Sequence, residues 1–164
     1  METKATPEFL ISQMRVLTMG EITFFYVMNQ PTAFANLDRD LDLLLDSLYR
    51  AKTQANLAEV GPDITRYYPA GIDQPDLFLM EVGIPVKPGT LPAGDAQVRI
   101  LPPYHCAGLL LWGSLMHMGQ THTTLIQAIK EAGLERTGEY REWNYWFEGV
   151  DSPHNLLGLY MGIR

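Results

Sequence analysis

The residues best suited to chemistry lie near the end of the chain, in the segment REWNYW (141–146). A glutamate becomes a general base when its surroundings support it, and a nearby phenol can assist by donating a hydrogen bond. We therefore take Glu142 and Tyr145 as the candidates for a catalytic pair. Successive side chains of a strand point to opposite sides. This alternation predicts two groups, one with Trp143, Tyr145 and Phe147 and the other with Glu142, Asn144 and Trp146.

A second carboxylate, Glu81, interrupts the otherwise apolar, strand-like run LFLMEVGIPV (77–86). Burying an unpaired carboxylate is costly, so Glu81 is expected to be exposed, paired or functional. The structural alternative places it on the solvent side of an edge strand. The functional alternatives make it an anchor for a cation or a base with a raised pKa.

Aromatic residues are concentrated in the strands predicted around these glutamates. Their faces offer a large contact area and attract cations, although packing in the core is the alternative for each of them. The predicted ligand-binding residues are Tyr68, Glu81, Trp112, Glu142, Trp143 and Tyr145.

The sequence gives little support for a reactive thiol, a metal site or a phosphate-binding loop. Cys106 is the single cysteine and lies in an apolar run, which is typical of an inert buried thiol. The four histidines do not have the spacing of metal ligands, so neither a metal nor a cofactor is expected. GTLPAG (89–94) lacks the lysine of a phosphate-binding loop.

Composition narrows the class of protein. The chain has 164 residues, of which 46% are apolar, so it can bury a sizeable core. Its net charge of −7 argues against binding nucleic acid through a general basic surface. The chain contains no apolar run of the ~20 residues that span a membrane, and its first residues do not have the order of a signal peptide. We therefore expect a cytoplasmic protein without a membrane segment.

Hydrophobic spacing predicts a strand and then a helix in each half of the chain. In the first half, ITFFYVM (22–28) is the strand, and leucines from 37 to 48 form one stripe of a helix that Pro31 and Thr32 begin. In the second half, AGLLLWGSL (107–115) is the strand.

The second helix is predicted from Thr121 to Ala132, with Gly133 as its left-handed stop. A repeated sequence segment follows each helix: YYPAGIDQP (67–75) resembles YWFEGVDSP (145–153). An apolar strand-like run comes after each of these segments.

We therefore predict an α+β fold, in which a duplicated β-α-β-β unit forms a pseudo-two-fold antiparallel sheet with two helices. A groove is expected where the units meet. Residues 1–13 are expected to form an N-terminal tail. Residues 14–164 are expected to form a single domain, with repeats at about 14–86 and 96–164.

Four stretches carry a resemblance to a known family, and they occur in the family's order. They are MEVGIPV (80–86), VRILPPYHCAGLLLW (98–112), IKEAGLERTG (129–138) and REWNYW (141–146). With them the chain resembles the GyrI-like effector-binding domain of multidrug-responsive transcription activators, from about Met14 onward. The resemblance implies a small-molecule receptor with an aromatic groove between the two halves. It also implies that a buried carboxylate often contacts cationic, lipophilic ligands.

The chain departs from the family pattern in its terminal strand. The family often has an acid there, where this chain has Gly158 or Leu159. Any carboxylate role is therefore expected to fall to Glu81, Glu142 or Glu148. About thirteen residues precede the first family-like segment, which we interpret as too few for a DNA-binding domain.

Three functions follow as hypotheses. The first is binding of a lipophilic small molecule, without nucleic acid. The alternative is a small-molecule hydrolase, which the resemblance also implies, with Glu142 or Glu81 as base and Tyr145 assisting. The third is a protein-binding regulator of the gyrase-inhibitor type. In it, an exposed C-terminal edge strand, LLGLYMGIR (156–164), pairs with a partner protein or a second copy.

Overall fold

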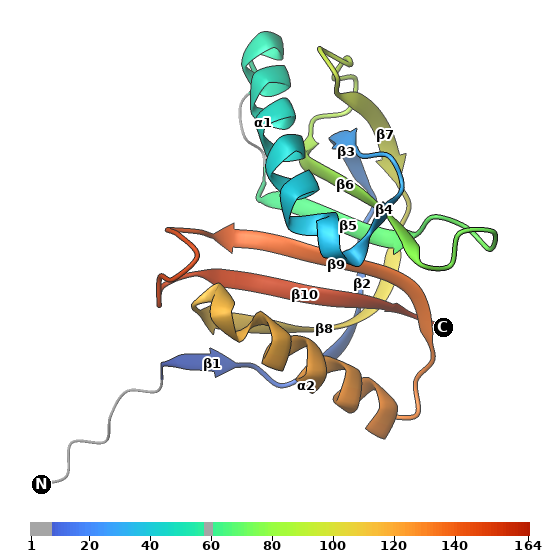
Figure 1. The fold of residues 1–164 in the computed structure, drawn as a ribbon, viewed down its shortest axis with the longest axis vertical. Coiled ribbons are helices and arrows are strands. Elements are labelled where there is room, and N and C mark those ends of the chain that lie inside the picture. Colours follow the sequence, from blue (N-terminus) through green and yellow to red (C-terminus); the bar gives the residue numbers. More distant parts are fainter. Residues whose placement is uncertain (1–7, 58–60) are drawn as a thin grey trace, which may run out of the picture.

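The computed structural model describes residues 8–57 and 61–164, and Figure 1 shows their arrangement. The strands of this part of the chain are β1 (Phe9–Ile11), β2 (Arg15–Met19), β3 (Ile22–Met28), β4 (Thr32–Ala33), β5 (Asp63–Pro69), β6 (Leu77–Val86), β7 (Gln97–Leu101), β8 (Tyr104–Gly113), β9 (Arg136–Trp146) and β10 (Leu156–Ile163). The helices are the 3-10 helices η1 (Phe34–Asn36) and η2 (Leu115–His117) and the α-helices α1 (Leu37–Ala55) and α2 (Met118–Glu131).

All of these strands join one antiparallel sheet. Its order is β1-β8-β10-β9-β5-β6-β3-β7, with β2 also paired to β8 and β4 to β6. The unit β3-α1-β5-β6 comes first in the chain and β8-α2-β9-β10 second, and the units join where β5 pairs with β9. The order of strands on the two sides of this junction is the same. The predicted α+β fold with a duplicated β-α-β-β unit is thus confirmed.

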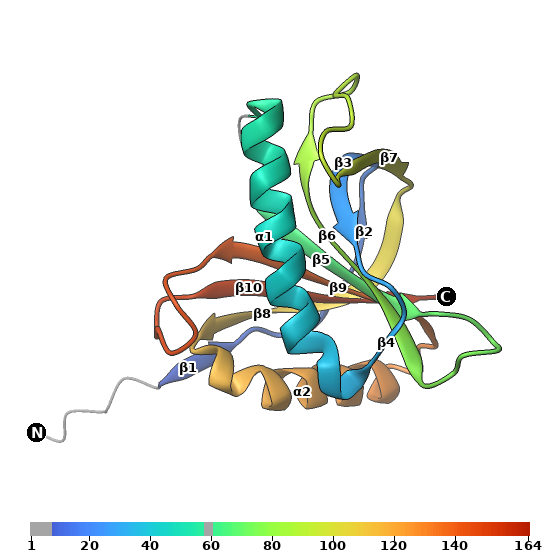
Figure 2. The ribbon, with the colours of Figure 1, turned by 45° about the horizontal axis from the view of Figure 1, so that its top comes forward.

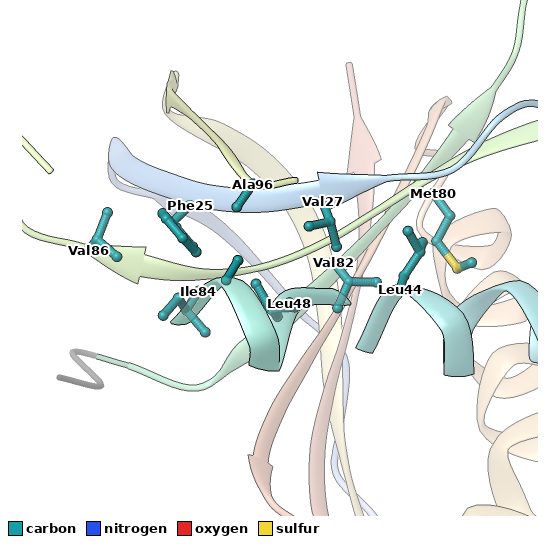
Figure 3. Packing of buried hydrophobic residues seen from close by; sticks show 10 residues of the cluster. Phe25, Val27, Leu44, Leu48, Met80, Val82, Ile84, Val86 and Ala96 are labelled. Atoms are coloured by element: carbon teal, nitrogen blue, oxygen red, sulfur yellow. The ribbon is translucent and has the colours of Figure 1, made fainter. Parts of the chain in front are cut away.

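Both α-helices cover the same side of the sheet, α1 over the first unit and α2 over the second (Figures 1 and 2). We call this the helix side and the other the back side. Under α1, Leu44 and Leu48 pack against Val27 of β3 and against Val82 and Ile84 of β6 (Figure 3). Burial of each such side chain contributes about 1.5–3 kcal/mol. The stripe of leucines therefore positions α1 as the sequence predicts.

The core under α2 is separate from the core under α1. Leu125 and Ile129 of α2 pack with Leu109 and Leu111 of β8 and with Leu159 of β10. Each unit thus has its own apolar layer between helix and sheet, and the surface between the two layers lies over β5 and β9.

The helix boundaries differ slightly from the prediction. α1 does not begin at Pro31 and Thr32, because Thr32 pairs with Phe78 of β6 and a 3-10 turn follows before Leu37. α2 begins earlier than Thr121, at Met118. Gly133 follows α2 with a φ of 68°, so the predicted left-handed stop is confirmed.

Two other differences concern the edges of the sheet. β1 lies within the predicted tail and pairs with β8, so the sheet begins before residue 14; residues 1–7 lie outside the described residues. The C-terminal strand β10 lies between β8 and β9 and is not an edge strand. The prediction that it pairs with a partner protein is therefore wrong, because both of its edges are already bonded within the chain.

Parts of the back side are buried although the helices do not cover it. Phe24, Tyr26, Ile64 and Leu101 form one cluster there, and Tyr104, Cys106 and Tyr160 form another. Short connections from β2 to β3 and from β7 to β8 join the outer parts of the sheet, and the sheet is curved (Figure 2).

Candidate functional site

On the helix side the two units meet through a pair of tyrosines. Tyr67 of β5 lies opposite Tyr140 of β9, and their rings stack with centroids 5.5 Å apart. Tyr67 packs against the core under α1 and Tyr140 against the core under α2. We define the helix-side seam as Tyr67, Tyr140, Glu142 and His122. Residues of both units therefore build it.

Hydrogen bonds link three residues of the seam. The Tyr140 hydroxyl donates a bond of 2.9 Å to Glu142 Oε1, and His122 Nε2 lies 2.6 Å from the same hydroxyl. A phenol has one proton, and here that proton goes to Glu142. His122 Nε2 must therefore donate to the Tyr140 oxygen, which makes it a protonated nitrogen.

The charge of Glu142 is not matched by an arginine or a lysine in the part of the chain that the structure describes. Its side chain is 20% exposed, and its ionic contact there is with His122 Nε2, 3.8 Å from Oε1. Asp38, in the first turn of α1, adds negative potential at Tyr67. A carboxylate beside two aromatic rings attracts cations by charge and by the ring quadrupole.

Burial raises the pKa of Tyr67 and of Tyr140 well above the usual tyrosine range, and the Glu142 carboxylate raises both further. Ionising either phenol would place another negative charge beside Glu142 in a poorly solvated position. Both phenols are therefore neutral hydrogen-bond donors at physiological pH.

On the back side, Glu81 is fully buried and bound by two arginines. Arg66 of β5 and Arg99 of β7 both form ion pairs with its carboxylate, and the Tyr68 hydroxyl donates a further bond of 3.2 Å. Its exposed fraction is 0%. The negative charge of Glu81 is thus already balanced from within the chain.

The charged network continues from Arg66 into the second unit. Arg66 Nε donates to Glu139 at 2.8 Å, and Arg141 Nε donates to the same carboxylate oxygen at 2.9 Å. Burial alone lowers the pKa of Arg66, but the Glu81 and Glu139 carboxylates outweigh this effect and raise it. This network of ion pairs therefore links β6, β5 and β9.

Aromatic rings fill the back side of the second unit. The hydroxyls of Tyr145 and Tyr160 are 2.8 Å apart, and Trp143 meets the Tyr160 ring edge-on at 6.4 Å. A Cβ on Gly158 would lie 2.5 Å from the Tyr160 ring and 2.8 Å from Tyr145, so the two rings cover this glycine. The tyrosines occupy space that a side chain at Gly158 would need.

The sheet divides the predicted ligand-binding residues between its two sides. Glu142 lies on the helix side, whereas Tyr68, Glu81, Trp143 and Tyr145 lie on the back side. Trp112 is 52% exposed near the end of β8, away from both glutamates in the sheet register. The six residues therefore do not form one site.

One predicted pairing is wrong, and one open alternative is decided. Tyr145 is unable to assist Glu142, because the strand turns their side chains to opposite sides of the sheet. Of the alternatives expected for Glu81, the structure shows the paired one; the residue is not on the solvent side of an edge strand, because β6 lies between β5 and β3. The sequence repeat is also misleading in detail, because its matched residues Tyr67 and Tyr145 lie on opposite sides of the sheet.

Sequence reasoning missed the partners of Glu142. Tyr140 is two residues before Glu142, a spacing that places both on one side of a strand and was available from the sequence. Tyr67 and His122 reach the seam from other elements, and the local pattern carries no signal for either. The arginines at Glu81 are likewise brought together only by the register of β7, β3, β6 and β5.

Two surface cavities lie on the helices. One, of 620 Å³, is lined by the α2 residues Gln120, Thr123, Thr124, Gln127, Ala128 and Glu131. The other, of 400 Å³, lies at the end of α1 near Tyr49 and Asn56. Neither of these two cavities is lined by residues of the helix-side seam.

Within the described residues, no cluster of three or more histidine, cysteine, aspartate or glutamate side chains has the geometry of a metal site. No helix in the same part of the chain is long and apolar enough to cross a membrane.

No protein-family model matches the sequence, and no curated protein matches it either. Solved structures are similar in fold. The C-terminal domain of EcmrR superposes with a TM-score of 0.68 at 13% identity, covering 93% of this chain and 97% of that domain. In a DNA-bound complex, the match covers 98% of this chain but 59% of the EcmrR chain, with a TM-score of 0.67 at 11% identity.

Two further structures have the same fold. SAV2435 bound to tetraphenylphosphonium has a TM-score of 0.68 at 9% identity, covering 93% of this chain and 94% of that one. A hydrolase encoded by lin2189 from Listeria innocua has a TM-score of 0.54 at 12% identity, covering 93% and 92%. The resemblance to GyrI-like effector-binding domains is thus confirmed as a shared fold.

Proposed function

We propose, given the GyrI-like effector-binding fold of this chain, that it is a cytoplasmic receptor for a lipophilic cation, which binds at the helix-side seam. One observation carries this proposal. Glu142 is a partly exposed carboxylate, bonded to neutral Tyr140 and facing stacked aromatic rings, without an arginine or lysine partner in the described residues.

The charge balance of the two glutamates selects the seam over the back side. Glu81 is fully buried and paired with two guanidinium groups, so a cation arriving there would meet Arg66 and Arg99. A cation at Glu142 would instead meet a carboxylate that lies beside two tyrosine rings. The attraction of a cation to an aromatic face is worth about 0.5–2 kcal/mol, and that to the carboxylate adds to it.

One of the comparisons supports a lipophilic cation as the kind of ligand. The structure of SAV2435, which has the same fold, is of that protein bound to tetraphenylphosphonium, a lipophilic cation. EcmrR contains a domain of this fold and forms a complex with DNA. A role of ligand binding in the regulation of transcription would be an extension of our proposal.

Titration calorimetry with tetraphenylphosphonium tests the proposal directly. We expect binding by the unmodified chain, and roughly tenfold weaker binding by Glu142→Gln, since the substitution keeps the shape and removes the charge. Glu135→Gln is the matched control, because Glu135 is exposed and pairs with Arg164 at the surface. Binding that Glu142→Gln leaves unchanged would exclude the seam.

A second candidate function is hydrolysis at the same residues. The cluster contains a carboxylate, two neutral phenols and a histidine, which together can accept a proton and stabilise an oxyanion. Here Tyr140 or Tyr67 takes the role first predicted for Tyr145. Turnover of an activated ester that falls ~10²-fold or more in Glu142→Gln would support catalysis. Equal rates in the two proteins would count against it.

A further inference from the structure

The helix-side seam holds an ionisable side chain beside the Glu142 carboxylate. His122 is the histidine of the seam, its side chain is 36% exposed, and its Nε2 is a donor to Tyr140. Within the described residues, its other ring nitrogen, Nδ1, has no hydrogen-bond partner. That nitrogen is therefore the place where a proton from solvent binds or leaves.

The groups that face His122 are acidic or neutral. From β9 they are Glu142 and the Tyr140 phenol, and beyond Tyr140 lie Tyr67 of β5 and then Asp38 of α1. The charged residues at the far end of its own helix, Lys130 and Glu131, are two turns away. A proton on Nδ1 thus places a full positive charge 3.8 Å from the Glu142 carboxylate, without another cation beside it in the described residues.

We propose that protonated His122 competes with the cationic ligand for Glu142, so that the seam binds cations more tightly when His122 is neutral than when it is protonated. This inference rests on the proposed function and adds its regulation. Protonation of Nδ1 cancels the charge of Glu142 for an incoming cation, while the Nε2 donor bond to Tyr140 is kept in both states. The change is therefore in charge and leaves the shape of the seam in place.

The test uses tetraphenylphosphonium as the probe, because its charge does not change with pH. Calorimetric titrations of the full chain at pH 5.5 and pH 8.0 should show about tenfold tighter binding at the higher pH, since one unit charge near the carboxylate is switched. His122→Gln keeps a donor for Tyr140 and cannot titrate, so its affinity should differ by less than about twofold between the two pH values. His154→Gln, at an exposed histidine paired with Glu148, is the control and should behave as the unmodified chain does.

The outcomes separate the two proposals. If the unmodified chain binds with the same affinity at both pH values, the role of His122 is overturned and the proposed function stands. If it does not bind tetraphenylphosphonium at either pH, the proposed function falls, and this inference with it. A pH dependence that persists in His122→Gln assigns the titration to another group and also overturns the role of His122.

Discussion

The two glutamates of the sheet occupy opposite sides and opposite electrostatic situations. Glu81 on the back side is fully buried, and Arg66, Arg99 and Tyr68 all bind its carboxylate. Glu142 on the helix side is 20% exposed, and its contacts are a neutral phenol and a histidine. Both residues interrupt predicted strands, and both were predicted to contact a ligand.

The difference shows that a buried carboxylate is not by itself a sign of a binding site. Removing one member of a buried ion pair leaves its partner as an unpaired buried charge, which destabilises the folded protein. Such a pair therefore has a structural role. A carboxylate without a cationic partner can instead take one from outside. The partners of each glutamate, more than its burial, decide which of the two roles it has.

The largest effect that we predict is on stability at Glu81. Glu81→Ala should lower the free energy of unfolding by about 3–5 kcal/mol, because Arg66 is left buried without its main counter-charge. Chemical denaturation of the variant measures the loss. A loss below about 1 kcal/mol would show that the arginines find other partners and would weaken the contrast between the two glutamates.

The next effect concerns the back side of the second unit. Gly158→Ala should destabilise the protein by about 1–3 kcal/mol, because its Cβ would meet the rings of Tyr160 and Tyr145. Gly71→Ala is the control, since a Cβ at Gly71 meets nothing within 4 Å. Equal melting temperatures for the two variants would contradict the close cover of Gly158 by the rings.

Alkaline pH should affect the tyrosines of the seam. The pKa values of Tyr67 and Tyr140 are raised in the folded chain, so their contribution to stability is fully present below the unfolded pKa of about 10 and is lost as pH rises above it. Each such group adds up to about 1.4 kcal/mol of loss per pH unit. The slope of unfolding free energy between pH 10 and 11 measures it, and Tyr67→Phe should reduce that slope. An unchanged slope in Tyr67→Phe would refute the shift.

The smallest effect should be on stability at Glu142. Glu142→Gln should change the free energy of unfolding by less than about 1 kcal/mol, because the carboxylate is partly hydrated and the amide still accepts a bond from Tyr140. The same denaturation experiment as for Glu81→Ala measures it. A loss as large as that of Glu81→Ala would make Glu142 a structural residue and remove the contrast.

Local patterns predicted the elements well where one residue type repeats with the right period. The leucine stripe of α1, the glycine after α2 and the strands on both sides of the linker all follow from spacing within one element. The start of α1 was less well predicted, because pairing of Thr32 with β6 competes with the helix. Such competition comes from a strand that is distant in the sequence.

The candidate site was predicted in part. Glu142 was identified, and alternation correctly separated it from Trp143 and Tyr145 on the same strand. The set of ligand-binding residues nevertheless combined both sides of the sheet. The histidines were considered only as metal ligands, and the contact of His122 with Tyr140 belongs to a different kind of site.

The sequence by itself determined the duplicated order of elements and which side chains share a face, because hydrophobic periodicity and strand alternation act over a few residues. Only the tertiary structure decided that Glu81 meets two arginines while Glu142 meets a tyrosine and a histidine. These contacts depend on the register of the sheet and on the placement of α2, which bring distant residues within the few ångströms over which ion pairs and hydrogen bonds act.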